Sequence, residues 1–246
     1  MLNQFSRTEL LIGEDGINKL HNAKVAVFGV GGVGSFVVEG LVRAGVGKFI
    51  LIDNDDVDIT NLNRQIHATH NTIGKYKVDL MEQRILEINP DAIVKKYRTF
   101  YMPENKEDIL ENHIDYIVDA IDTVTAKIEI AVDATRLNIP AIAAMGTGNK
   151  LDPTKFEITD ISKTKMCPLA KVMRKKLKEK GIKKYKVLYS TEEPSVPDQE
   201  LEKECVKGTN KKQVPGSVSF VPSVAGLIIA GQVIKDLIKG NEKNEK

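Results

Sequence analysis

Apolar and polar positions are most clearly ordered between residues 25 and 53. A short β-branched run from Val25 to Phe28 breaks into a cluster of glycines, and a second apolar run from Phe49 to Ile52 ends in Asp53. Between the two runs, apolar residues recur at the spacing of a helix face: Val33, Phe36, Val37, Leu41 and Val42. This order predicts a strand, a glycine turn, a helix and a second strand, which is typical of a phosphate-binding βαβ unit.

The glycine turn supplies the first candidate binding residues. Glycine lets a backbone approach phosphate closely, and the N-terminus of the following helix offers unpaired N–H groups and partial positive charge. The candidates are Gly29, Gly31, Gly32 and Gly34. Asp53 lies 21 residues after Gly32, at a position where a carboxylate accepts hydrogen bonds from ribose hydroxyls.

Strand and helix patterns continue to alternate as far as residue 148. The further strands expected are 92–94, 115–120 and 140–145, and the helices are 74–88, 103–112 and 124–138. Alternation of this kind predicts an α/β fold. We expect a Rossmann-like, doubly wound, mostly parallel sheet with helices on both faces.

The chain after residue 148 has a different pattern and is expected to form a smaller C-terminal part. It adds strands over 156–161 and 187–189, a basic helix over 168–180, a loop over 191–215 and a closing helix over 221–239. We expect one domain over 1–246, because this length suits a single α/β domain. Its parts are a helical arm (1–22), a nucleotide-binding core (23–148), a substrate-facing part (149–240) and a disordered tail (241–246).

Composition places the chain among soluble enzymes. Of its 246 residues, 41% are hydrophobic and 28% charged, which is ordinary for a soluble domain. No signal-peptide pattern opens the chain, and the longest apolar stretch, Ser219 to Ile234, is interrupted by proline and glycines. The two cysteines, Cys167 and Cys205, form no Cys-x-x-Cys pair, so no zinc knuckle or disulfide framework is implied. We therefore expect a cytoplasmic protein that does not cross a membrane.

Polar residues beyond Asp53 indicate which nucleotide binds. Arginine can hold phosphate bidentately and lysine acts on it as a point charge, while a carboxylate at a strand end suits Mg²⁺. The candidates are Asp55, Asn61, Asn63, Arg64, Lys77, Asp122 and Thr123. None of the four histidines stands where an NAD oxidoreductase needs its acid–base residue. ATP is therefore favoured over NAD.

Five motifs, in their order along the chain, carry a resemblance to a known family. They read GVGGVG, LID, TNLNRQ, GKYKVD and DAIDT. Together they resemble the adenylating superfamily of ubiquitin-activating, ThiF-type enzymes. The resemblance implies that Gly32 lies at the phosphates of ATP, Asp53 at the ribose and Asp122 at Mg²⁺. It also implies three residues around the triphosphate, which are Asn61, Arg64 and Lys77.

An N-terminal arginine is a further implication of this resemblance. The superfamily forms homodimers in which such an arginine reaches the partner's ATP, and Arg7 in QFSRTELLIG matches that position. From the residues alone, a solvated surface arginine is the other interpretation of Arg7. With the resemblance, the expected catalytic set is Arg7, Arg64, Lys77 and Asp122.

The second half of the chain indicates which family within this superfamily the sequence resembles. ThiF-type and molybdopterin-synthase activators usually carry two Cys-x-x-Cys pairs, which are absent here. Instead, DPTKFEITDISKTKMCPLAKVMRKKLK and SFVPSVAGLIIAGQVI resemble the bacterial tRNA threonylcarbamoyladenosine dehydratases. This resemblance implies ligase-type, ATP-dependent cyclisation of N6-threonylcarbamoyladenosine beside the anticodon, through an acyl-adenylate. ATP and Mg²⁺ are the implied cofactors, with a monovalent cation and a sulfur-relay protein as further candidates. The substrate supplies the nucleophile, so neither Cys167 nor Cys205 is needed for it.

A basic run over 171–186 holds nine Lys or Arg residues against one acid. Most charge runs are solvated helix faces, but this excess exceeds what solubility requires and fits contact with a tRNA backbone. The candidates are Lys171, Arg174, Lys175, Lys176 and Lys178. Three other functions stay open: an adenylyltransferase for a ubiquitin-like sulfur carrier, an NAD oxidoreductase, and a non-catalytic nucleotide-binding scaffold.

Overall fold

A single seven-stranded sheet carries the fold of the computed structural model, which describes residues 2–102, 104–110, 113–206 and 214–239. The strands are β1 (Lys24–Phe28), β2 (Lys48–Ile52), β3 (Ile93–Tyr97), β4 (Tyr116–Asp119), β5 (Ala141–Ala144), β6 (Phe156–Asp160) and β7 (Lys186–Ser190). Their order across the sheet is β3-β2-β1-β4-β5-β7-β6. All neighbours are parallel except β6 and β7, which are antiparallel. The predicted Rossmann-like, mostly parallel sheet is confirmed.

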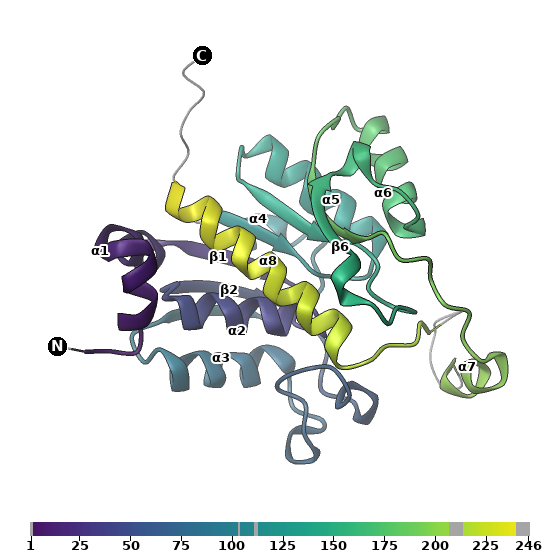
Figure 1. The fold of residues 1–246 in the computed structure, drawn as a ribbon, viewed down its shortest axis with the longest axis horizontal. Coiled ribbons are helices and arrows are strands. Elements are labelled where there is room, and N and C mark those ends of the chain that lie inside the picture. The colour runs from purple at the N-terminus through teal and green to yellow at the C-terminus, as the bar shows by residue number, and fades with distance from the viewer. Residues whose placement is uncertain (1, 103, 111–112, 207–213, 240–246) are drawn as a thin grey trace.

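Helices cover both faces of the sheet (Figure 1). They are α1 (Ser6–Asn22), α2 (Gly34–Ala44), α3 (Lys77–Ile88), α4 (Lys106–Leu110), α5 (Val124–Arg136), α6 (Pro168–Glu179), α7 (Gln199–Val206) and α8 (Phe220–Lys239). Successive residues of a strand point to opposite faces. Accordingly, Val25 and Val27 of β1 pack with α2, α3 and α8, whereas Ala26 and Phe28 pack with α4 and α5. A strand buried on both faces explains the unbroken apolar run of β1.

The structure differs from the sequence prediction between residues 191 and 215, which were expected to be a loop. Helix α7 lies within this stretch. The Asp198 carboxylate caps the start of the helix, accepting hydrogen bonds from the backbone N–H groups of Glu200 at 2.9 Å and Leu201 at 3.1 Å. An Asp cap followed by residues without Gly or Pro was the available helix signal. The predicted helix start at Pro103 and the predicted tail over 241–246 lie outside the described residues.

Helix α8 packs directly on α2, the helix that follows the glycine turn (Figure 1). Two glycines allow this close approach. A Cβ at Gly226 would lie 2.4 Å from the Val33 carbonyl oxygen, and one at Gly40 would lie 2.7 Å from the Ala230 Cβ. By length and composition alone α8 could cross a membrane. Its buried side chains, which include Ile229 and Val233, instead belong to the core of the domain.

Candidate active site

The carboxyl edge of the sheet carries two adjoining cavities. Cavity A has a volume of about 340 Å³ and lies where β1, β2 and β4 end. Cavity B has a volume of about 350 Å³ and extends from the end of β4 to the loop after β5. The two share four residues, which are Arg64, Ala120, Ile121 and Asp122. Strand order reverses between β1 and β4, and open α/β sheets bind their ligands at such a switch point.

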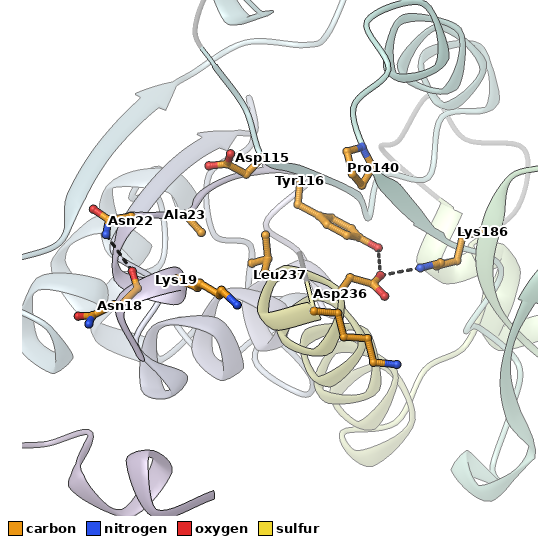
Figure 2. A pocket seen from close by; sticks show the side chains of 11 residues that line it. Asn18, Lys19, Asn22, Ala23, Asp115, Tyr116, Pro140, Lys186, Asp236 and Leu237 are labelled. Carbon is orange, nitrogen blue, oxygen red and sulfur yellow. Dashed lines mark hydrogen bonds and ion pairs between the residues drawn. The ribbon is translucent and has the colours of Figure 1, made fainter. Parts of the chain in front are cut away.

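A larger hollow of about 650 Å³ lies at the opposite, amino edge, between α1 and α8 (Figure 2). The Asp236 carboxylate stands in it and is already engaged by the protein. One of its oxygens accepts hydrogen bonds from the Tyr116 hydroxyl at 2.6 Å and the Lys186 ammonium at 2.5 Å, and the other accepts from the Gln232 amide at 2.7 Å. These bonds link α8 to the starts of β4 and β7, so the Asp236 carboxylate holds parts of the fold together. We therefore take the cavities at the carboxyl edge as the candidate active site.

Most of the predicted nucleotide-binding residues line cavity A. They are Gly29, Asp53, Asp55, Asn61, Arg64, Lys77, Asp122 and Thr123. Gly32 lines cavity B instead. Gly31, Gly34 and Asn63 line neither cavity. A Cβ at Gly34 would lie 1.8 Å from the Gly29 carbonyl oxygen, so this glycine allows the turn to pack on the start of α2.

Asp53 follows the end of β2 and is held by two backbone N–H groups. Its carboxylate accepts hydrogen bonds from Val30 at 2.6 Å and from Asp55 at 2.9 Å. Burial raises the pKa of the Asp53 carboxyl, while Lys77 and the two N–H donors oppose this effect. The hydrogen bond from Val30 holds the carboxylate next to the glycine turn. In a bound nucleotide the ribose adjoins the phosphates, so an acid that binds ribose must lie beside the turn that binds phosphate.

Two basic side chains approach cavity A from outside the glycine turn. Lys77 begins α3 and is only 5% exposed, and its ammonium lies 2.7 Å from the more exposed carboxylate of Asp55. Arg64 is half-buried, and its guanidinium donates to the Thr60 carbonyl and the Asn63 side-chain oxygen, both at 2.9 Å. In the described part of the chain no carboxylate pairs with Arg64. Burial lowers the pKa of Arg64, as expected for a cation that lacks a neutralising anion.

The segment around Arg64 is folded by polar contacts, which explains why its sequence has little apolar periodicity. Asp58 caps the short 3₁₀ helix Ile59–Asn61, accepting from the Thr60 backbone N–H at 2.7 Å. The Asn61 side-chain oxygen accepts from the Asp58 backbone N–H at 3.2 Å, which completes a capping box. The cap fixes Asn61 at the wall of cavity A and holds the turn that leads to Arg64.

Two buried residues after Arg64 were not singled out in the sequence. Gln65 lines cavity A, is 6% exposed, and its side-chain oxygen has no hydrogen-bond partner among the described residues. His67 is equally buried, and burial, followed by the nearby charge of Lys77, lowers its pKa to about 4. The available signal was the position of Gln65 directly after Arg64, within TNLNRQ.

Asp122 lies at the boundary of the two cavities, and a buried ion pair holds the turn before it. Lys127 of α5 and Asp119 of β4 are 2.9 Å apart, and neither side chain is exposed. The Lys127 ammonium also donates to the Ile121 carbonyl at 3.2 Å, and the Asp119 carboxylate accepts from the Ile121 backbone N–H at 3.3 Å. Sequence reasoning missed this pair. Its signal was a charged residue inside the apolar run DYIVDA.

The remaining candidates lie away from the two cavities. Arg7 is exposed on α1 and lines neither of them. On α6, Arg174 donates to the Thr164 carbonyl and hydroxyl, both at 2.8 Å. The other four basic candidates of that helix are exposed and are Lys171, Lys175, Lys176 and Lys178. Cys167 is buried just before α6, and the side chain of Cys205 lies outside the described residues.

A doubly wound sheet whose switch point joins a glycine turn, an acid after β2 and two basic side chains defines a nucleotide-binding α/β protein with a phosphate site. The model of the ThiF family matches residues 5–246. The chain belongs to the ThiF family.

Individual relatives agree with this assignment. The chain is 50% identical to the tRNA threonylcarbamoyladenosine dehydratase of Bacillus subtilis over 98% of its own length and 97% of that protein. Its fold matches the crystal structure of the Escherichia coli tRNA N6-threonylcarbamoyladenosine dehydratase in complex with ATP, with a TM-score of 0.85 and 32% identity. This match covers 96% of this chain and 94% of that one. The sulfur carrier protein ThiS adenylyltransferase of Escherichia coli is 34% identical over 59% of this chain and 58% of its own length.

Proposed function

We propose that this protein is a tRNA threonylcarbamoyladenosine dehydratase, which uses ATP to cyclise N6-threonylcarbamoyladenosine beside the anticodon of tRNA. The observation that carries the proposal is the pair of adjoining cavities, because they share Arg64 and Asp122 and so bring a phosphate site next to a second binding space. The near full-length identity to the Bacillus subtilis enzyme supports the choice of reaction.

The reaction has two steps, and the protein supplies no nucleophile. The threonyl carboxylate attacks the α-phosphorus of ATP, giving an acyl-adenylate and pyrophosphate. The carbamoyl group then closes onto the activated carbonyl, giving the cyclic nucleoside and AMP. Lys77 and Arg64 stabilise the negative charge that builds up on the phosphates, which is the main contribution a protein makes to phosphoryl transfer. Asp53 holds the ribose and the glycine turn holds the phosphates.

The proposed Mg²⁺ site is Asp122, and the residues present fit it. Within the described residues there is no cluster of three His, Cys, Asp or Glu side chains that could hold a metal alone. Mg²⁺ usually binds through one or two carboxylates together with substrate phosphates. Asp122 supplies one carboxylate at the boundary of both cavities, and ATP would supply the other ligands. When bound, the ion would neutralise charge on the phosphates.

The proposal also covers the partners of the enzyme and its location in the cell. The exposed lysines of α6 contact the tRNA backbone, and a homodimer places Arg7 of one protomer at the ATP of its partner. The cytoplasm is the location that suits a tRNA-modifying enzyme. A monovalent cation and a sulfur-relay protein are further candidate ligands, suggested by the family resemblance alone.

A second candidate function is the adenylation of a ubiquitin-like sulfur carrier. The similarity to the ThiS adenylyltransferase favours it, because both proteins would form an acyl-adenylate with ATP. The missing Cys-x-x-Cys pairs and the basic face of α6 favour tRNA.

Incubation with ATP and tRNA that carries threonylcarbamoyladenosine tests the proposal. We expect the nucleoside to lose the mass of one water while AMP is released, as read by mass spectrometry. Lys77→Ala should lower turnover about 100-fold or more, because it removes a preorganised cation from the phosphates. Lys75→Ala is the matched control, since Lys75 is exposed two residues away. No mass change with the wild-type protein would overturn the function, and full turnover by Lys77→Ala would overturn the site.

A further inference from the structure

Cavity B differs chemically from cavity A. Apart from the residues shared with cavity A, its walls are mostly small or apolar: Gly32, Val33, Ala144, Met145, Gly146, Thr147, Gly148, Leu169, Val214, Pro215, Ser217 and Pro222. Its volume of about 350 Å³ lies within the range of small-molecule sites. Because it opens onto Arg64 and Asp122, a ligand in cavity B would reach the phosphates of a nucleotide bound in cavity A.

The loop after β5 adds hydrogen-bonding groups to this apolar wall. Met145 still pairs with the sheet, its backbone N–H donating to the Leu188 carbonyl at 2.8 Å. The next three residues leave the sheet, and among the described residues the backbone N–H groups of Gly146, Thr147 and Gly148 have no protein acceptor. All three residues line cavity B. Consecutive N–H groups of this kind suit a ligand rich in carboxylate and carbonyl oxygens.

Another part of the wall of cavity B is a strap, residues 214–217, which leads to α8. Asn149 fastens it to the loop after β5. The Asn149 side-chain oxygen accepts from the Gly216 backbone N–H at 2.7 Å, and the Asn149 backbone N–H donates to the Gly216 carbonyl at 2.8 Å. From the other side, the Asn63 amide donates to the Ser217 carbonyl at 3.0 Å. Hydrogen bonds with two asparagines, Asn149 and Asn63, therefore hold this part of the wall of cavity B in place.

Backbone conformation and packing show how closely the strap is fitted. Asn149 has a φ of +57°, a left-handed conformation that asparagine tolerates better than most residues. A Cβ at Gly148 would lie 2.7 Å from the Cβ of Pro215, so only glycine lets the strap approach the loop. The sequence N-K after G-T-G thus places Asn149 directly after the three residues whose backbone N–H groups have no acceptor among the described residues.

We propose that cavity B binds the threonylcarbamoyl arm of the substrate nucleoside, and that Asn149 is a positioning residue that holds the wall of this cavity in place. The proposal rests on the proposed function, which supplies the chemical class of the ligand. The arm presents its carbamoyl carbonyl and its hydroxyl to the N–H groups of residues 146–148, and its methyl group to the apolar wall. Its carboxylate then lies on the side of the cavity that faces Arg64, where adenylation occurs.

Binding of synthetic anticodon stem-loops without ATP tests this assignment, because no turnover occurs. The measured quantity is the affinity of each protein for a stem-loop with threonylcarbamoyladenosine relative to the same stem-loop with adenosine. We expect the wild-type preference to fall about tenfold or more in Asn149→Gly, which keeps the backbone conformation but loses the acceptor oxygen. Gly148→Ala should have the same effect by displacing Pro215. Asn149→Asp, which keeps an acceptor, should restore the preference.

Asn138→Gly is the matched control. Asn138 has a φ of 54°, its side chain makes no hydrogen bond within the described residues, and it lies after α5, away from both cavities. It should keep the wild-type preference, and calorimetric titration with ATP should show unchanged affinity in every variant. An unchanged preference in both Asn149→Gly and Gly148→Ala would overturn the inference, while cyclisation by the wild-type protein would leave the proposed function standing. A wild-type protein without preference and without cyclisation would overturn both.

Discussion

Asp119 and Lys127 show how a single buried contact can set the geometry of the site. Their ion pair has no exposed side-chain surface and clasps the backbone of Ile121 from both sides, directly before Asp122. Burial raises the pKa of Asp119, and Lys127 opposes that shift. A charge in this position is tolerated because it is paired.

We expect Asp119→Leu to lower the free energy of unfolding by about 3–5 kcal/mol, because it leaves the Lys127 ammonium buried without its partner. The double variant Asp119→Leu with Lys127→Met should recover most of that decrease, since it removes both charges. Urea unfolding followed by circular dichroism measures both. If the double variant is as unstable as the single one, packing around the pair, and not its charge, dominates.

Individual site residues were predictable where a side chain suited to a ligand stands at a defined position of a local sequence motif. Asp53 and Lys77 belong to motifs with a stated ligand, and both line cavity A. Asn149 and Asp119 were not predictable in the same way, because their roles depend on the tertiary fold. Asn149 bonds to a residue far away along the chain, and the pairing of Asp119 with Lys127 requires α5 to fold back onto β4. No local pattern encodes either arrangement.

Helix α6 has one face that packs in the core and another that exposes lysines to solvent. Ala170, Met173 and Leu177 are buried against α5, whereas Val172 is 45% exposed. The exposed lysines therefore stand on a rigidly packed helix. Arg174 contributes to its anchoring through Thr164.

Replacing Lys171 and Lys175 of α6 by alanine should weaken tRNA binding mainly at low salt. For each phosphate that a removed lysine had neutralised, the slope of the logarithm of affinity against the logarithm of salt concentration should fall by about 0.7–1. Fluorescence anisotropy over a series of salt concentrations gives that slope. Lys235→Ala on α8, also exposed, serves as the control. An unchanged slope in the α6 variant would show that this face is only solvated.

Elements were predictable where apolar periodicity was strong, as in β1, α3 and α8. Helix α7 was missed because it contributes no described residue to the hydrophobic clusters and so has little apolar pattern to detect. The position of β7 between β5 and β6 also lay beyond sequence reasoning. Strand order depends on how the crossover helices pack. The apolar pattern of a strand does not indicate which other strands pair with it.

At the scale of the whole molecule, Arg7 raises the question of assembly. It lies exposed on α1, whose Leu10 and Leu11 are also more than four-fifths exposed. Neither cavity of the same chain contains Arg7. The proposed homodimer would bring Arg7 of one chain to the ATP of the other.

Mixing Arg7→Ala protein with Lys77→Ala protein tests a site shared between two protomers. In a mixed dimer, the chain with an intact Lys77 would receive the intact Arg7 of its partner. We expect cyclisation to recover to about one quarter of the wild-type rate after exchange of equal amounts, since about half of the dimers are mixed and each has one complete site. No recovery, despite subunit exchange verified by native mass spectrometry, would place Arg7 in the site of its own chain, and full turnover by Arg7→Ala protein alone would place it outside catalysis.

The packing of α8 on α2 also has a consequence for biosynthesis. Helix α2 emerges from the ribosome early, whereas α8 is the last helix described along the chain. Until α8 is made, the apolar face of α2 around Gly40 and Val37 lacks its final cover. The nascent protein would therefore carry the glycine turn long before α8 covers α2, and nucleotide capture would be delayed until α8 has been synthesised.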